Sequence, residues 1–253
     1  MIAISLQSGS SGNCLYIEAN GVKLLFDAGI SSLEAGRRLA AFDRDIKDVD
    51  ALIISHDHGD HIRHAGVFQR RYNIPLYLTE PTLNFANAKM KLGKLHDLNF
   101  FKSGDSLTFK EVSVQSIPCP HDSADGSVFV INSQGKKLGI ITDLGHVTQE
   151  LRDIIPTLDA VFLESNYDPG MLQEGAYPEF LKKRITGLHG HLSNLEAAEL
   201  LLSGERLQWA CLAHISNNNN DPSTALKTHR EVLGNDLQLY TASRFEASGA
   251  FSL

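Results

Sequence analysis

The stretch Ala51-Leu52-Ile53-Ile54-Ser55-His56-Asp57-His58-Gly59-Asp60-His61 places three histidines directly after a short apolar run. The run is typical of a buried strand that ends in a turn, so the polar residues are expected at the edge of a sheet. His56 and His58 are two residues apart and can reach one ion together. Gly59 frees the backbone to change direction, so Asp60 and His61 can reach a second ion nearby.

This pattern is interpreted as a metal site. Imidazoles and carboxylates that leave water need a partner, and an ion would satisfy several of them at once. The alternative is a solvated histidine-rich loop, which would not require this spacing beside a strand end.

Two more histidines and an aspartate lie further along the chain, each at the end of an apolar run. His121 follows the expected strand 112–117, Asp143 ends the run 138–142, and His214 ends the run 209–213. Each of the three therefore caps an expected strand.

The motif H-x-H-x-D-H at 56–61, with the three later residues in this order, resembles the metal motifs of the metallo-β-lactamase-fold hydrolases. The resemblance implies two ions and distributes the ligands between them. It assigns His56, His58 and His121 to one ion and Asp60, His61 and His214 to the other. Asp143 would bridge both.

Other segments resemble one group within that family, the YycJ/WalJ group, and are also similar to the cyclic phosphodiesterase PhnP. They are Leu6-Gln7-Ser8-Gly9-Ser10-Ser11-Gly12-Asn13, Phe26-Asp27-Ala28-Gly29, Gly190-His191-Leu192-Ser193-Asn194 and Ala213-His214-Ile215-Ser216. The resemblance spans nearly the whole chain and implies phosphodiester cleavage, including 5′-exonuclease activity on DNA. His64 departs from the pattern and receives no role.

Strands and helices alternate along the chain without repeats. Strands are expected at 3–6, 14–19, 22–26, 52–55, 76–78, 112–117, 128–132, 138–142, 160–163, 210–213 and 237–240, and helices at 33–41, 61–72, 81–92, 149–155, 178–185, 195–202 and 223–233. This order fits an α/β (α+β) fold with two packed sheets and helices outside, in one domain over residues 1–253. The resemblance implies the same four-layer αββα sandwich.

Composition favours a compact cytoplasmic enzyme. The 253 residues are 42% hydrophobic, which is enough to bury a substantial core. No apolar run approaches the roughly 20 residues that cross a bilayer, and the first residues lack the pattern of a secretory signal. A net charge of −7 argues against bulk electrostatic coating of nucleic acid but does not exclude a nuclease.

The expected chemistry follows from two adjacent ions. They would lower the pKa of a shared water, so that a metal-bridged hydroxide attacks the substrate. Asp60 would orient this nucleophile or accept its proton. Nitrogen and oxygen ligands without thiolate favour zinc and also suit manganese. Cys119 lies two residues before His121, and it is interpreted as an apolar filler.

Residues beyond the ligands are expected to select the substrate. Ser193 and Glu196 form a capping-box pattern at the start of a helix, where free amides suit a phosphate. His191 precedes this helix and is predicted to contact the phosphate or protonate the leaving oxygen, with Ser193 and Asn194 as further substrate contacts. A structural histidine is the alternative. Asp27 is expected to orient a ligand imidazole, and Arg63 is an open candidate for a phosphate contact.

Three functions compete. The favoured one is a dinuclear phosphodiesterase or nuclease that acts on nucleic acid or a small phosphodiester. A thioesterase or lactonase would use the same ions on a carbonyl and needs no phosphate pocket. A non-catalytic metal-binding module is disfavoured because a structural zinc is usually closed by four ligands. The sequence leaves oligomeric state and end polarity open.

Overall fold

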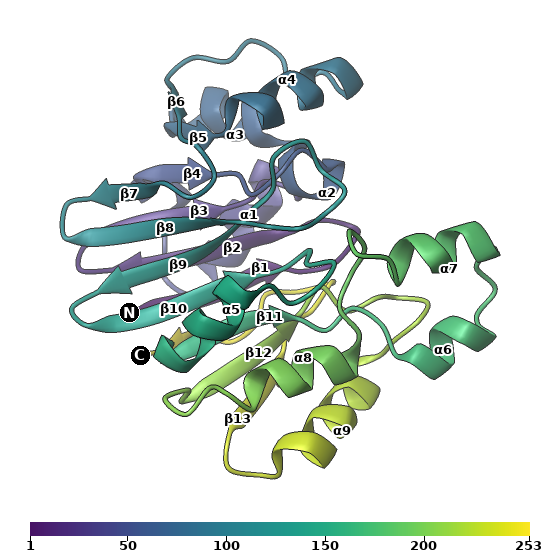
Figure 1. Ribbon diagram of the computed structural model, residues 1–253. Helices are drawn as coiled ribbons and strands as arrows, with labels where there is room; N and C mark the ends of the chain where they lie inside the picture. Colours follow the sequence, from purple (N-terminus) through teal and green to yellow (C-terminus); the bar gives the residue numbers. More distant parts are fainter.

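The computed structural model describes residues 1–253 as two seven-stranded sheets packed face to face (Figure 1). The first sheet has the order β14 (Phe251–Ser252), β1 (Ile2–Gln7), β2 (Cys14–Ala19), β3 (Val22–Phe26), β4 (Ala51–Ile53), β5 (Leu76–Leu78) and β6 (Leu98–Phe100). The second has the order β13 (Gln238–Thr241), β12 (Trp209–Ala213), β11 (Ala160–Glu164), β10 (Lys136–Ile141), β9 (Ser127–Ser133), β8 (Val112–Pro118) and β7 (Ser106–Phe109).

The space between the sheets is filled by alternate side chains of both. One buried cluster contains Leu15, Ile17 and Phe26 of the first sheet together with Phe129 and Phe162 of the second. The rings of Phe26 and Phe129 meet across the interface with centroids 5.2 Å apart. Such a two-residue period buries one face of each strand and sends the other face outward.

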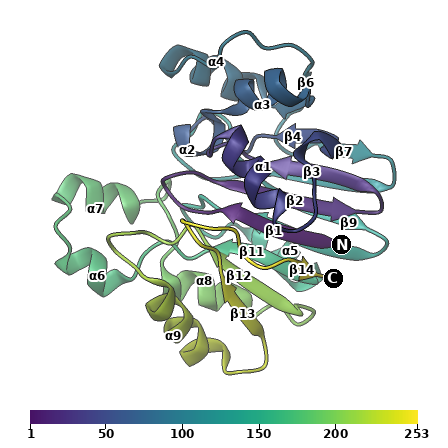
Figure 2. The ribbon, with the colours of Figure 1, turned by 180° about the vertical axis from the view of Figure 1, so that it is seen from behind.

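Helices cover both outward faces (Figures 1 and 2). Helices α1 (Ser32–Ala40), α3 (Ala65–Tyr72) and α4 (Glu80–Lys89) share a buried cluster with the first sheet. Helices α5 (Gln149–Ile154), α8 (Asn194–Leu201) and α9 (Pro222–Leu233) share another with the second sheet. The three buried clusters lie between four layers of helices and sheets, which form the αββα sandwich that the sequence predicts.

The remaining helices are short and connect the layers. They are α2 (Gly59–Ile62), α6 (Pro169–Glu174), α7 (Glu179–Ile185) and the 3₁₀ turns η1 (Ile46–Asp48) and η2 (Ile155–Thr157). In Figure 1, α2, α6 and α7 all lie on the right-hand side of the molecule. No helix is long and apolar enough to span a bilayer.

Strand direction brings distant parts of the chain to one edge. Strands β3 and β4 are parallel, and β10, β11 and β12 are parallel to one another. β8 runs in the same direction as β10 because both pair antiparallel with β9. The carboxyl ends of these strands are where an open sheet of this kind usually binds its ligands.

Most predicted elements are confirmed, and one helix is wrong. The expected helix 61–72 is two helices, because the chain breaks at Arg63 and His64. Ala28, just after β3, donates its amide to the carbonyl of His61 and accepts the amide of His64, which diverts these groups from a continuous helix. The one-domain organisation stays a prediction.

Candidate metal centre

The seven predicted ligands meet at one edge of the sandwich. Each comes from a strand end or from the turn that follows it: His56 and His58 after β4, Asp60 and His61 on α2, His121 after β8, Asp143 after β10, and His214 after β12. Both sheets therefore contribute, so the cluster straddles the interface between them.

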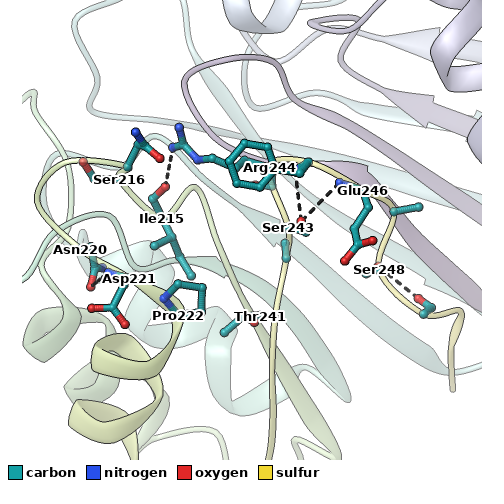
Figure 3. Close-up of a pocket in the computed structure, with 16 residues that line it drawn as sticks. Ile215, Ser216, Asn220, Asp221, Pro222, Thr241, Ser243, Arg244, Glu246 and Ser248 are labelled. Carbon is teal, nitrogen blue, oxygen red and sulfur yellow. Dashed lines mark hydrogen bonds between the residues drawn. The ribbon is translucent and has the colours of Figure 1, made fainter.

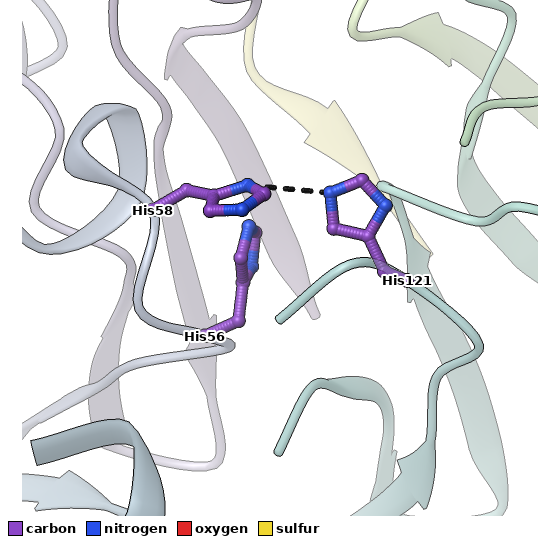
Figure 4. A group of neighbouring side chains, drawn as sticks. All are labelled: His56, His58 and His121. Carbon is purple, nitrogen blue, oxygen red and sulfur yellow. Dashed lines mark hydrogen bonds between the residues drawn. The ribbon is translucent and has the colours of Figure 1, made fainter. Parts of the chain in front are cut away.

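One group consists of His56, His58 and His121 (Figure 4). Their ligand atoms all lie within 4.8 Å of one another, and Nδ1 of His58 is 3.3 Å from Nε2 of His121. In the figure the three rings converge from two segments of the chain on one point.

A second group consists of Asp60, His61 and His214. Oδ2 of Asp60 lies 3.6 Å from Nε2 of His61 and 3.6 Å from Nε2 of His214. Asp143 lies between the two groups. Its carboxylate oxygens are 3.2 Å from Nε2 of His61, 3.5 Å from Nε2 of His214 and 3.8 Å from Nε2 of His121.

These separations suit a shared cation. Nitrogen ligands at the usual distance from a tetrahedral zinc ion lie about 3.3 Å from one another. Nε2 of His56, Nε2 of His214 and Oδ2 of Asp143 are buried without any hydrogen-bond partner. Buried polar atoms are normally paired, so orphaned atoms within one cluster indicate a missing common partner. The cluster is therefore suited to divalent metal binding.

The opposite nitrogen of each imidazole contacts an outer acceptor. Nδ1 of His61 is 2.7 Å from Oδ2 of Asp27, and Nδ1 of His121 is 2.9 Å from the carbonyl oxygen of Gly190. The remaining pairs are Nδ1 of His56 with Oγ of Ser55, Nε2 of His58 with the carbonyl of Asp122, and Nδ1 of His214 with Glu164. When the outer nitrogen donates its proton, the inner nitrogen presents a lone pair to the cluster.

The carboxylates create a strongly negative local environment. Burial alone would raise the pKa of Asp60, but His61 and His214 outweigh it and lower the pKa to about 2. Burial alone would lower the pKa of His214, but Asp143, Asp60 and Glu164 raise it to about 10. Ionised carboxylates that hold protons on neighbouring imidazoles also attract a metal cation, which competes for the same nitrogens.

The backbone is held in an uncommon conformation at the cluster. Asp27, Asp143 and His214 all have positive φ angles, of 65°, 59° and 52°. Non-glycine residues rarely adopt this region, and such positions gather at functional sites. Beside them, Gly29 packs so closely that a Cβ there would lie 1.7 Å from the carbonyl oxygen of Asp60. Only glycine fits at that position.

His191 lies beside the cluster and is paired with a buried acid. Its Nδ1 is 2.7 Å from Oε1 of Glu164, and its ring centroid is 5.1 Å from that of His121 and 5.3 Å from that of His214. The same Glu164 oxygen is 3.1 Å from Nδ1 of His214. Burial alone would raise the pKa of Glu164, but His191 and His214 lower it to about 2, so the acid is ionised.

The start of α8 forms the predicted capping box, but its polar groups are occupied. Oγ of Ser193 accepts the amide of Glu196, and the Glu196 carboxylate accepts the amide of Ser193. Asn194 is fully buried, with its side chain bonded to Ser165 and Asn220 and its amide bonded to the carbonyl of Tyr167. Both side chains are therefore engaged within the protein in this structure, and their contact with substrate stays a prediction.

Arg63, Cys119 and two histidines without an assigned role, His64 and His189, lie outside the ligand groups. The Arg63 side chain is exposed and folds back to donate to the carbonyl of Gly59. His189 is exposed, and His64 is half-buried. Burial raises the pKa of Cys119 well above its usual range, and its thiol donates to the carbonyl of Asp143, as suits a filler rather than a nucleophile.

Sequence reasoning placed Glu164 only at the mouth of the site and gave Asn13 no role of its own. Glu164 ends β11, between β10 and β12, so like Asp143 and His214 it follows an apolar run that is visible in the sequence. Asn13 extends its amide to within 2.9 Å of Nε2 of His61 and 3.4 Å of Oδ2 of Asp60. Nothing in its local sequence pairs it with residues so far along the chain.

Comparisons with known proteins agree with this geometry. Residues 8–191 match the model of the metallo-beta-lactamase superfamily. Exodeoxyribonuclease WalJ of Streptococcus pneumoniae serotype 2 is 35% identical over 219 residues, which cover 85% of this chain and 81% of that protein. Exodeoxyribonuclease YycJ of Bacillus anthracis is 34% identical over 230 residues, covering 90% of this chain and 87% of that protein.

Among solved structures, the metallo-beta-lactamase fold protein YhfI from Bacillus subtilis shares the fold. It superposes with a TM-score of 0.75 at 16% identity, over 99% of this chain and 98% of that one. The family model covers more than half of the chain, and the two relatives match it over most of their own length. The chain therefore belongs to the metallo-beta-lactamase superfamily and, within it, to the WalJ/YycJ group.

Proposed function

We propose that this protein is a divalent metal-dependent nuclease that hydrolyses phosphodiester bonds of DNA as a 5′-exonuclease. The observation that carries this proposal is the buried cluster of histidines and aspartates with the His191–Glu164 pair beside it. It occurs in a chain 34–35% identical, over most of its length, to proteins named exodeoxyribonucleases. Cleavage from the 5′ end is the most specific claim of this proposal.

The residues assigned to metal are the seven predicted ones. His56, His58 and His121 would hold one ion, Asp60, His61 and His214 the other, and Asp143 both. Zinc is the first choice and manganese the second, because the donors are nitrogen and oxygen. Two such ions neutralise charge on the phosphodiester and lower the pKa of water at the site.

Asp60 is proposed to act on the attacking water as well as to bind metal. Its carboxylate is ionised, with a pKa lowered to about 2. It is also only partly buried, so a water molecule can reach it. An ionised carboxylate beside the reacting centre can orient the water and accept its proton.

His191 is proposed to serve the leaving group rather than the metal. Glu164 accepts from its Nδ1, which leaves Nε2 as the free nitrogen. A histidine held in one orientation by a carboxylate can donate a hydrogen bond to the phosphate or a proton to the leaving oxygen. Asp27, bonded to Nδ1 of His61, is proposed to orient that ligand.

Two alternatives are less well supported. A thioesterase or lactonase could use the same cluster, but the relatives named above are exodeoxyribonucleases. A non-catalytic zinc module would need only four ligands, and the cluster offers more. We also infer a cytoplasmic location, since Cys14, Cys119 and Cys211 are all unpaired.

The test is degradation of end-labelled oligonucleotides by protein reconstituted with zinc or with manganese. We expect shortening of DNA labelled at one end, and hydrolysis of bis(p-nitrophenyl) phosphate well above that of thioesters and lactones. Asp143→Asn is the matched inactive protein, and Asp153→Asn, on the exposed face of α5, should behave as wild type. If acyl substrates were hydrolysed faster under the same metal conditions, the nuclease proposal would be abandoned.

A further inference from the structure

A cavity of about 540 Å³ lies beside the segment that directly follows the proposed ligand His214 (Figure 3). It is formed by Ser8, by the segment 215–222 that follows the ligand His214, and by the C-terminal segment 241–249. A volume of this size is in the range that holds a drug-sized molecule, which is also the size of one nucleotide. None of the seven proposed metal ligands lines this cavity.

The cavity contains an arginine without a counter-ion. Nη2 of Arg244 donates to the carbonyl oxygen of Ile215 at 2.9 Å, and Arg244 forms no ion pair with a carboxylate. Figure 3 shows the guanidinium directed toward that carbonyl. The other donors of the guanidinium remain free. Burial lowers the pKa of Arg244, and a partly buried cation without an anionic partner is costly, so the site suits an anionic ligand.

Arg244 is close to the metal ligands by two routes. Ile215, whose carbonyl it contacts, directly follows His214. On the other side the guanidinium packs on Gly9, where a Cβ would lie 3.1 Å from Nη2. Gly9 donates its amide to Oδ1 of Asn13, and the amide of Asn13 is 2.9 Å from Nε2 of His61. Two short chains of contacts therefore connect Arg244 with the second ligand group.

The neighbouring residue is an exposed aromatic. The side chain of Phe245 lines the cavity and is 78% exposed, the most exposed large hydrophobic residue of the chain. An exposed ring beside a free guanidinium matches the two contacts that a single nucleic acid strand uses, stacking of a base and pairing of a phosphate.

The remaining charges limit what the cavity can take. Asp221 and Glu246 also line it, so its net charge does not favour a polyanion. Asp221 uses its carboxylate to cap α9, through the amides of Ser223 and Thr224. One phosphate at Arg244 with a base against Phe245 fits this mixed lining, because carboxylates and amides can accept hydrogen bonds from the edge of a base.

We propose that this cavity binds one nucleotide of a single-stranded substrate next to the scissile bond, with its phosphate on Arg244 and its base stacked on Phe245. This proposal rests on the proposed nuclease function and adds the strand-binding site to it. A base within an intact duplex is stacked on its neighbours and cannot face Phe245, so the site favours unpaired ends.

The experiment is the binding of a fluorescent, phosphorothioate-linked single-stranded DNA oligonucleotide, which resists hydrolysis, to the metal-loaded protein. We expect Kd to rise about tenfold or more for Phe245→Ala, the usual scale for loss of one base stack. Arg244→Gln should weaken binding and reduce the slope of log Kd against log salt by about 0.7, as expected for one lost phosphate contact to a single strand.

Matched controls separate this site from the general surface. Phe100→Ala removes another exposed phenylalanine, on the edge strand β6, and Arg71→Gln removes an exposed arginine of α3; both should bind as wild type. Metal content and melting temperature verify folding, and Phe245→Ala is the safer variant because its ring is exposed. If wild type binds and cleaves DNA while Phe245→Ala and Arg244→Gln bind equally well, the strand site is refuted and the nuclease stands. If wild type neither binds nor cleaves DNA, both proposals fail.

Discussion

At the scale of single residues, Glu164 links two histidines with different proposed roles. One of its oxygens contacts Nδ1 of His191 at 2.7 Å and Nδ1 of His214 at 3.1 Å, and the other accepts the amides of Leu144 and Leu192. The acid is completely buried, so these four contacts replace its hydration. Loss of its charge should therefore disturb both the metal site and His191.

Substitution of these two residues should give different results. In His191→Ala, we expect full metal content and turnover reduced by roughly 10²-fold, the scale for loss of a general acid or positioned donor. In Glu164→Gln, both metal affinity and turnover should fall, by about 10- to 100-fold, because His214 loses its outer partner. Metal analysis after dialysis and steady-state kinetics on a small phosphodiester distinguish the two.

The control for this pair is His189→Ala, an exposed histidine two residues from His191, which should match wild type in both measurements. Loss of metal in His191→Ala would make that residue a ligand. Near-normal turnover would return it to the structural alternative.

At the scale of elements, α9 contains a histidine whose charge the fold cannot easily accommodate. His229 is fully buried; its Nδ1 donates to the carbonyl of Ala225, and its Nε2 has no partner. Burial lowers the pKa of His229 to about 4, against a usual value near 6.5. Between these values the unfolded chain binds a proton that the folded chain does not, so stability falls as pH falls through this range.

We expect His229→Asn to weaken this acid sensitivity, because asparagine keeps a donor near Nδ1 and does not titrate. The free energy of unfolding of wild type should decrease between pH 7 and pH 4.5 by about 2–3 kcal/mol more than that of the variant. Denaturant unfolding at both pH values measures this difference. His96→Asn, in an exposed loop, is the control and should follow wild type. Equal pH dependence in wild type and His229→Asn would contradict the assignment.

The elements that sequence predicted well are those with a strong local signal. The strands 14–19 and 22–26 are confirmed at the predicted bounds. The Asn20-Gly21 turn between them fixes the end of the first strand and the start of the second. Strands β6, β7 and β14 and helix α6 were not predicted. Each is short, and β14 exists through its pairing with β1 at the other end of the chain. Such pairing is invisible to a local pattern.

The candidate site shows the same division. The histidine-rich segment 56–61 is recognisable from local sequence, whereas His121, Asp143 and His214 were assigned through the resemblance to the family's ligand set. Glu164, Asn13 and Arg244 depend on which strands and loops become neighbours in three dimensions. The helix start at Ser193 is recognisable from local sequence too, but its predicted contact with substrate stays a prediction. A capping box satisfies the very amides that an anion would need.

At the scale of the whole molecule, the candidate metal ligands come from both halves of the sandwich. His56, His58, Asp60 and His61 follow β4 of the first sheet, whereas His121, Asp143 and His214 follow strands of the second. Bound ions would thus tie the sheets together at the edge where the apolar interface ends. Because ions bind this arrangement only in the folded chain, their binding free energy adds to the stability of the fold.

Chelation should therefore lower both the number of ions bound per chain and the stability of the fold. After reconstitution and removal of free metal, we expect two divalent ions per chain. Two sites saturated 100-fold above Kd contribute about 5 kcal/mol, so chelation should lower the melting temperature by on the order of 10 °C. Asp143→Asn, which alters the residue between both groups, should retain fewer ions and respond little to chelator, whereas Asp153→Asn should behave as wild type. Elemental analysis measures the number of ions, and a single ion per wild-type chain would refute the shared role of Asp143. Calorimetry measures the melting temperature, and a value that chelator does not change would refute the metal link between the sheets.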